Sequence, residues 1–152
     1  MRLLLLGLHL LGFVLWLGGG LAAMLVGATA RRAERGEAVL LIALSGRLHR
    51  ALILPGVLLT VLSGLMLTLQ LYGGAVSVSG FPTSLMVMQG TGLLAAGIVL
   101  AVSLPTVTRL GRLDPQGPQA PLFQALQRRA ALSASLAGSL GLIALLAGAW
   151  MA

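Results

Sequence analysis

Long apolar stretches alternate with short polar connections along this chain. Four stretches reach or exceed the roughly 20 residues that a helix needs to cross ~30 Å of hydrocarbon. They are residues 3–30, 51–71, 84–110 and 126–152. Because chain within hydrocarbon must satisfy its backbone hydrogen bonds internally, these stretches are predicted to be helices rather than strands. The pattern therefore predicts an all-α, polytopic membrane protein with a single domain over residues 1–152, built as a bundle of four transmembrane helices.

Two features modify this picture of four straight helices. The apolar segment 36–46 is too short to span a membrane, so it either lies at the membrane interface or extends the second helix inward. Pro55 and Pro105 lie about one turn inside the second and third spans, where each removes a backbone hydrogen bond. We therefore expect bends near these prolines.

The arginines indicate an orientation. Nine of the ten basic residues lie in or beside two alternate connections, between spans one and two and between spans three and four. The positive-inside rule places these connections in the cytoplasm and both termini outside, with only Arg2 opposing. Tyr72, Phe81 and Trp150 then fall at the outer boundary, where an aromatic belt is expected.

Composition excludes a soluble domain and changes which partner the positive net charge indicates. The chain is 58% hydrophobic and 9% charged, against roughly 25% charged in globular proteins. A net charge of +7 would suggest nucleic acid as a partner of a soluble chain. Beside membrane spans, the expected partners are the bilayer and its anionic headgroups, not nucleic acid. We expect a bacterial-like inner (cytoplasmic) membrane.

The start of the chain also imitates a signal peptide. Met1-Arg2, a leucine-rich run and Ala28-Thr29-Ala30 resemble the three regions of such a peptide. Its apolar run of about 27 residues exceeds the usual 7 to 15. We therefore interpret this segment as the first membrane span.

Several kinds of chemistry are excluded or poorly supported. The chain has no cysteine, which excludes disulfides, thiolate metal sites and cysteine nucleophiles. Its only carboxylate side chains, Glu34, Glu37 and Asp114, lie near arginines in polar connections. Acid/base catalysis within the membrane therefore has no carboxylate to use.

His9 is the most informative residue, because an ionisable side chain within a span indicates a functional site by default. Gly12, Phe13 and Trp16 share its helical face. An imidazole can be an axial haem ligand, glycine allows close approach of a macrocycle, and aromatic rings pack against its faces. Alternatively, His9 hydrogen-bonds a neighbouring helix and the glycines only permit packing.

His49 is a less favourable candidate. It opens the second span on the inner side, about 30 Å along the first helix from the depth of His9. One haem within one chain cannot be ligated by both. We expect His49 at the interface, beside Arg47 and Arg50 and near lipid phosphates.

The methionines are distributed unevenly under this topology. Those predicted in the outer half with His9 are Met1, Met66, Met86, Met88 and Met151, whereas Met24 lies deep on the inner side. Imidazole and thioether together suit a His/Met haem or a Cu(I) ion. Gln89 lies at the same level and can orient His9 or a ligand. Methionine also commonly fills gaps, so ordinary packing is the alternative.

Two sequence segments resemble a known superfamily. LHLLGFVLWLGG has a His, a Trp seven residues later and a glycine pair, and RLHRALILPGVLLTVLSGLML has Arg, then Pro, then Gly. The pattern resembles small four-helix membrane proteins that include the copper-resistance D family and the membrane-type protoporphyrinogen oxidases. The segment SLPTVTRLGRL most resembles their uncharacterised bacterial relatives.

The resemblance covers spans one to three and implies a haem-associated role for His9. The oxidase branch also carries a lysine early in span three, whereas this chain has no lysine and places Met86 or Met88 there. This departure argues against protoporphyrinogen oxidation. Copper transport is the role implied by the copper-resistance branch.

Three hypotheses follow. The first is a membrane protein that binds b-type haem in the outer half, with His9 as axial ligand and Met86 or Met88 as partner, in electron transfer or haem handling. Under this hypothesis the protein could form a homodimer or work with a membrane redox partner. Any enzyme activity would be that of a haem-dependent oxidoreductase. The second is copper binding or transport through His9, Met66, Met86 and Met88. The third is a cofactor-free accessory subunit of a membrane complex.

Overall fold

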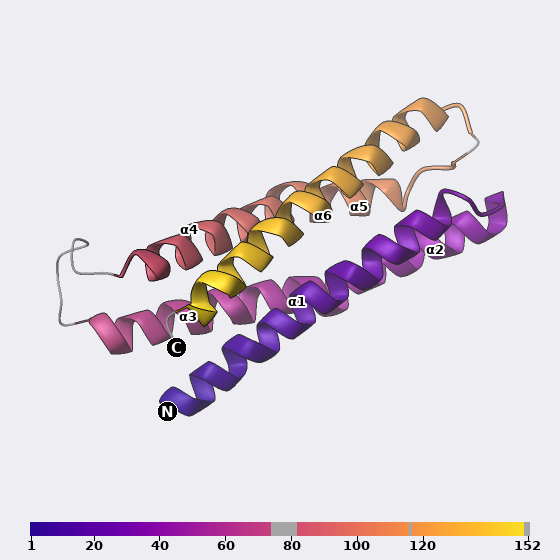
Figure 1. Ribbon diagram of the computed structural model, residues 1–152. Coiled ribbons are helices and arrows are strands. Elements are labelled where there is room, and N and C mark those ends of the chain that lie inside the picture. Colours follow the sequence, from indigo (N-terminus) through magenta and orange to yellow (C-terminus); the bar gives the residue numbers. More distant parts are fainter. Residues whose placement is uncertain (74–81, 116, 151–152) are drawn as a thin grey trace.

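The computed structural model describes residues 1–73, 82–115 and 117–150, apart from the side chain of Arg35. These residues form an all-α bundle of four long helices, each long and apolar enough to cross a membrane (Figure 1). This confirms the predicted fold class. Phe81, Met151 and the predicted end of the last span at Ala152 lie outside the described residues.

Two of the four long helices are composite. The elements in chain order are α1 (Arg2–Ala30), then α2 (Arg35–Leu48), η1 (His49–Ile53) and α3 (Leu54–Tyr72), then α4 (Thr83–Ile98), η3 (Val99–Ser103) and α5 (Leu104–Leu110), and finally α6 (Ala120–Ala149). The second long helix is therefore continuous through the segment 36–46. Its apolar span of 37 residues, Gly36–Tyr72, is about 55 Å long at ~1.5 Å per residue, more than the ~30 Å of a hydrocarbon core. Of the two alternatives for the segment 36–46, the structure shows the extension.

The last helix begins earlier than its apolar pattern suggests. α6 starts at Ala120, with Pro121 in its first turn, where the missing N–H of proline removes no helical hydrogen bond. Arg128 and Arg129 therefore lie inside a helix, before its most apolar part.

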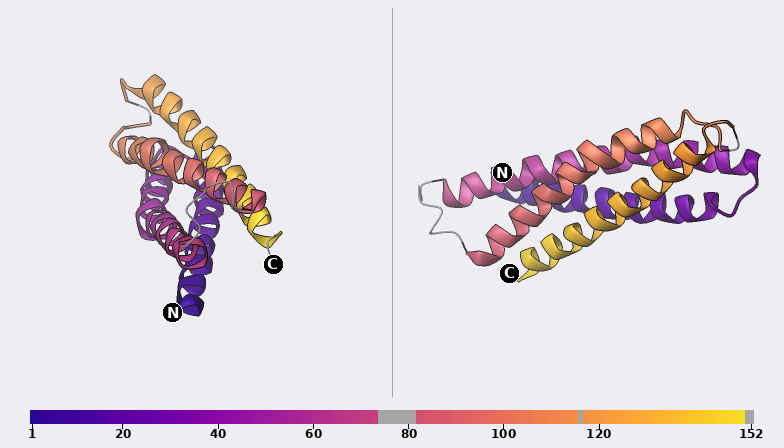
Figure 2. Two further views of the ribbon diagram at one scale, coloured as in Figure 1. Left: turned by 90° about the vertical axis from the view of Figure 1, so that its left-hand side faces the viewer. Right: turned by 90° about the horizontal axis from the view of Figure 1, so that it is seen from above.

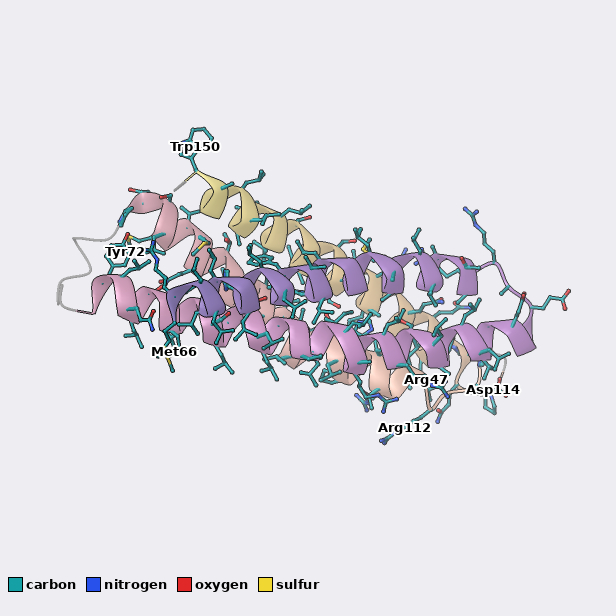
Figure 3. The ribbon with its side chains drawn as sticks, turned by 90° about the horizontal axis from the view of Figure 1, so that it is seen from below. Arg47, Met66, Tyr72, Arg112, Asp114 and Trp150 are labelled. Carbon is teal, nitrogen blue, oxygen red and sulfur yellow. The ribbon has the colours of Figure 1, made fainter. Side chains whose placement is uncertain are left out.

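Both arginine-bearing connections lie at one end of the bundle, and both termini lie at the other (Figure 1). Tyr72 and Trp150 mark the second end, which we call the terminal end (Figure 3). Arg47 and Arg112 mark the opposite end, which we call the arginine end, together with Asp114 (Figure 3). This arrangement is the one that the positive-inside argument requires.

The helices are arranged as two hairpins. α1 packs along α2, η1 and α3, and α6 packs along α4, η3 and α5, whereas α3 and α4 touch at few positions (Figure 2). The hairpins meet through a central core made by Trp16, Ala23, Ile53, Val57, Ala95, Ala96, Val99 and Ala137. Many large apolar side chains, such as Leu25 and Leu40, instead point outward, as expected of a surface that faces lipid.

Glycine lets α1 and α3 approach to backbone contact. A Cβ atom added to Gly12 would lie 2.6 Å from the backbone nitrogen of Thr60, and one added to Gly56 would lie 2.6 Å from that of Trp16. Close approach through small residues is a common mode of helix association in membranes. The hydrophobic effect does not drive association there, because lipid tails are as apolar as the helix surfaces. Gly12 therefore serves helix packing, which is the second of the two roles considered for the glycines of this face.

Replacing Gly56 by alanine is expected to destabilise the bundle by about 1–3 kcal/mol, because the new methyl group would overlap the backbone of α1. The matched control is Gly97→Ala in α4, where a Cβ meets nothing within 4 Å. Alanine there should be neutral or stabilising by about 0.5–1 kcal/mol, since glycine disfavours a helix interior. Unfolding in mixed detergent micelles measures both variants, and equal stability of the two would contradict this account.

The two prolines within the bundle each follow a π-helical turn. Pro55 and Pro105 cannot donate a backbone hydrogen bond. Immediately before them, the N–H of Leu54 donates to the carbonyl of His49, and the N–H of Leu104 donates to the carbonyl of Val99, both across a widened turn. We expected bends here, and the structure shows that the disturbance takes the form of η1 and η3. Such turns rotate the residues that precede the proline and are frequent at functional sites.

Candidate functional site

His9 lies in the terminal half of the bundle, where α1 faces α3. Its Nδ1 atom is 2.8 Å from the carbonyl oxygen of Thr60 and 3.3 Å from the Oγ atom of Ser63. Because a carbonyl oxygen only accepts, Nδ1 carries the proton and donates it to Thr60. The Nε2 lone pair of the neutral ring is thereby left free. Histidines that bind metals are commonly held in this way, with the second ring nitrogen fixed by a carbonyl.

Two cavities adjoin His9, and we call them the His9 cavities. The larger, about 370 Å³, lies among all four helices, and the smaller, about 230 Å³, lies among α1, α3 and α4. Both are lined by His9, Phe13, Gly64 and Met88. The remaining lining is mostly apolar. An apolar pocket with a few convergent polar groups is the usual form of a small-molecule site.

The aromatic residues predicted on the face of His9 do lie together. The rings of His9 and Phe13 meet edge to face with centroids 5.3 Å apart, and Phe13 stacks on Trp16 at 5.9 Å. Both aromatic residues are buried. Gly12 shares the face but lines neither His9 cavity, because it packs on the backbone of α3.

Gly64 on α3 is the closest neighbour that sequence reasoning missed. A Cβ atom at this position would lie 2.8 Å from Cε1 and 3.1 Å from Nδ1 of His9. Any larger residue would therefore displace the imidazole. The spacing of Gly56, Thr60 and Gly64, each four residues apart on the face toward α1, is the signal from which it could have been found.

The methionines separate into one that faces the site and two that do not. Met88 lines both His9 cavities, and its sulfur would lie 3.0 Å from a Cβ atom on Gly148 of α6. Met66 and Met86 are 54% and 48% exposed and line neither cavity. The structure thus brings Met88 together with His9, but it places Met66 and Met86 on the outer surface of the bundle (Figure 3 labels Met66).

Gln89 joins two helices that otherwise contact little. Its Nε2 atom donates to the Oγ1 atom of Thr68 at 2.6 Å, and its side chain lines the smaller His9 cavity. The amide therefore fixes α4 against α3 beside His9. Among the described residues, its hydrogen bond goes to Thr68 and not to the imidazole, so Gln89 is a wall residue of this cavity.

Arg2 and Tyr72 line the larger His9 cavity at the terminal end. From the sequence, Arg2 was only the exception to the positive-inside rule. In the structure it lies in the first turn of α1 and lines this mostly apolar cavity. A cation at this place suits a ligand that carries carboxylates at its polar edge.

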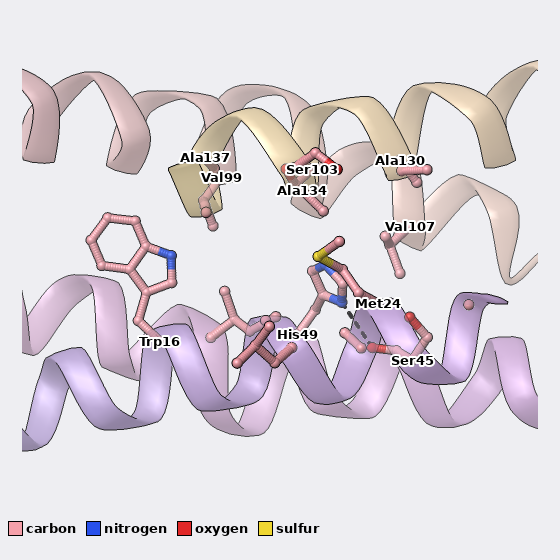
Figure 4. Close-up of a pocket in the computed structure, with 18 of the residues that line it drawn as sticks. Trp16, Met24, Ser45, His49, Val99, Ser103, Val107, Ala130, Ala134 and Ala137 are labelled. Atoms are coloured by element: carbon pink, nitrogen blue, oxygen red, sulfur yellow. Dashed lines mark hydrogen bonds between the residues drawn. The ribbon is translucent and has the colours of Figure 1, made fainter. Parts of the chain in front are cut away.

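His49 is buried inside the bundle, so the expectation of a side chain exposed to lipid phosphates beside Arg47 and Arg50 was wrong. It is 6% exposed, and its Nδ1 atom donates to the carbonyl oxygen of Ser45 at 2.9 Å. The π-helical turn η1 directs it toward a third cavity of about 240 Å³ between α1, η1, η3 and α6, which we call the His49 cavity (Figure 4). His9 and His49 therefore line separate cavities.

No protein-family model matches the chain, and no curated protein or solved structure shows significant similarity to it. Within residues 1–73, 82–115 and 117–150, no three His, Cys, Asp or Glu side chains are grouped as metal ligands.

Proposed function

We propose that this multi-pass membrane protein binds a b-type haem at the terminal end of the bundle, with His9 as an axial ligand. The observation that carries the proposal is the setting of the imidazole. Thr60 holds Nδ1 through a backbone carbonyl, and Nε2 is left free beside two apolar cavities. Haem, when bound, would supply a redox-active iron, and the protein would tune it through this ligand and its hydrogen bond.

The volume and the mostly apolar lining of the His9 cavities suit a mostly apolar macrocycle. The larger cavity alone, about 370 Å³, falls in the size range of about 300–1,000 Å³ that is common for small-molecule sites. Phe13 provides an aromatic wall, and Gly64 leaves room beside the imidazole. Arg2, which lines the larger cavity, would pair with the propionate groups of the macrocycle.

Met88 is the proposed partner ligand from within the chain, since it is the methionine that shares both cavities with His9. Met88→Leu is expected to shift the ferrous haem spectrum while costing less than ~1.5 kcal/mol of stability, because the side-chain volume is nearly conserved. Met86→Leu, on the outer surface two residues earlier, is the control and should leave the spectrum unchanged. Identical spectra of both variants and the wild type would assign Met88 to packing and leave the second position to water, a small molecule or another chain.

The proposed role is electron transfer or haem handling in a bacterial-like inner membrane. We place the arginine end in the cytoplasm, beside anionic headgroups, and the His9 cavities toward the outside. This role is in keeping with the resemblance to the copper-resistance D and protoporphyrinogen oxidase-like superfamily. The absence of lysine in the sequence argues against the oxidase reaction itself.

Copper is the second candidate, supported by the shared position of one imidazole and one thioether. His9 and Met88 line the same two cavities, and both are suitable ligands for Cu(I). Of the four residues predicted for a copper site, Met66 and Met86 lie elsewhere. The geometry therefore supports copper with two ligands rather than four.

An absorption spectrum and a metal analysis of the same purified sample distinguish these functions. Protein from cells with ample haem supply should show a Soret band and contain iron. Bound copper without a Soret band would support the second candidate. A colourless, metal-free sample would contradict both and leave the role of a cofactor-free accessory subunit.

A further inference from the structure

A second buried histidine faces a cavity that the haem proposal does not use. The His49 cavity lies toward the arginine end and is separated from the smaller His9 cavity by Trp16, which lines both. Its walls are mostly apolar and small, with alanines and glycines of α1 and α6 in addition to Ile53, Val99 and Val107 (Figure 4). It is therefore a separate compartment within the same bundle.

The two π-helical turns place a polar group on each side of this cavity. η1 contributes His49 and η3 contributes Ser103, both buried and both lining the cavity. Figure 4 shows the His49 ring pointing away from its own helix toward the facing pair of helices. A π-helical turn followed by a proline therefore occurs in both the second and the third long helix.

Both polar groups are left as hydrogen-bond acceptors. The Nδ1 proton of His49 is donated to the carbonyl of Ser45, so Nε2 presents a lone pair, and it has no hydrogen-bond partner within the described chain. The Ser103 hydroxyl donates to Ser133 at 3.0 Å, and Ser133 donates in turn to the carbonyl of Ala130 at 3.1 Å. A ligand with hydroxyl or amine donors would satisfy both acceptors inside this mostly apolar cavity.

The glycines of this cavity keep space open instead of bringing helices together. A Cβ atom added to Gly20, Gly27 or Gly138 would meet nothing within 4 Å, in contrast to Gly12 and Gly56. All three line the cavity between α1 and α6. Small side chains on both helices thus leave free space between α1 and α6 in a mostly apolar cavity.

Together these features point to one ligand class. We infer that the His49 cavity binds the ring of a hydroquinone (a lipid-soluble quinol), with its hydroxyl groups donating to Nε2 of His49 and to Oγ of Ser103. A volume of about 240 Å³ is below the usual ~300–1,000 Å³ of drug-sized sites and suits a single ring whose tail remains in the bilayer. An oxidised quinone has carbonyls in place of hydroxyls, so it cannot donate to either acceptor. A fatty acid anion lacks these donors as well, and its carboxylate would instead pair with Arg31, which also lines the cavity.

The test compares related ligands with and without hydroxyl donors, in equilibrium binding to the purified full chain in lipid nanodiscs under anaerobic conditions. The ligands are decylubiquinol, decylubiquinone and the dimethyl ether of the quinol. The reduced form should bind about tenfold more tightly than the other two, as expected for hydrogen bonds to buried acceptors. His49→Leu should remove this preference, and Ser103→Ala should weaken it. Thr108→Val, which removes an exposed hydroxyl from α5 outside the cavity, should change nothing.

A cavity-filling variant keeps the test independent of His49. Gly138→Leu places its side chain into open space and should weaken binding of all three ligands while the protein still folds. Equal binding of the quinol and its dimethyl ether to the wild type would overturn the proposal and indicate a cavity for acyl chains. Quinol binding that survives both His49→Leu and Gly138→Leu would also overturn it. Loss of the Soret band in a folded His49→Leu variant, with the band retained in His9→Ala, would instead assign the His49 cavity to haem and overturn both proposals.

Discussion

Replacing His9 by alanine is expected to abolish the Soret band of the purified protein. The variant loses the imidazole that lines the two cavities of the terminal half and that is held there by the carbonyl of Thr60. No other imidazole lines these cavities, since His49 lines a different one. The expected effect is therefore loss of haem rather than a shift of its spectrum, and a pyridine haemochrome assay measures it.

His49→Ala is the matched control for this result. It also removes a buried imidazole with a carbonyl-bound Nδ1 atom, so general damage from losing a buried histidine should be similar. Its Soret band should remain nearly unchanged. Equal loss of haem in both variants would show that the effect comes from folding or from a haem that does not sit at His9. Size-exclusion chromatography of both variants separates these explanations.

Replacing Gly64 by alanine is expected to weaken haem binding by roughly 10- to 100-fold, the range common for residues that orient a ligand. The added methyl group would lie 2.8 Å from Cε1 of His9, closer than real Cβ atoms approach another side chain. The imidazole must then move, and its hydrogen bond to the carbonyl of Thr60 must lengthen or break. Haem titration followed by absorbance gives the change in affinity.

Gly90→Ala and Gly97→Ala on α4 test whether the effect is specific to the contact with His9. A Cβ atom at either position meets nothing within 4 Å, so both variants should keep the affinity of the wild type. If Gly64→Ala binds haem as tightly as these controls, the imidazole does not need the position that the structure shows. The proposed ligand would then lose its main geometric support.

The secondary structure and the membrane-spanning class followed from the sequence because hydrocarbon imposes strong local rules. A long apolar stretch in lipid has to be a helix, and its length is set by the thickness of the membrane. The arginine pattern likewise placed two connections at one end of the bundle, as the structure shows (Figure 1). Boundaries were less well predicted where polar residues continue a helix beyond the apolar part, as at Ala120.

The face shared by His9, Phe13 and Trp16 also followed from helical periodicity, since residues three, four and seven apart lie on one side of a helix. Periodicity within one helix says nothing about which neighbour this face meets. The contact with Thr60 and Gly64 depends on the backbone approach of α1 and α3 at Gly12 and Gly56. Only the tertiary structure showed that Gly12 serves this approach and not a cofactor.

The methionines and His49 also show that the sequence does not give the direction in which a side chain points. Depth along a helix can be counted from the sequence, and it placed Met66, Met86 and Met88 near the level of His9. Depth does not determine direction, and only Met88 of these three turns inward. For His49, the π-helical turn before Pro55 changes the direction that an α-helical count would give.

The sequence by itself thus determined the four long helices, their order and the end of the bundle at which the arginine-bearing connections lie. These features depend on local hydrophobicity and charge. The tertiary structure decided which side chains share a cavity. That outcome depends on how closely the helices approach and on where π-helical turns rotate them, and both arise from contacts between residues far apart in the chain.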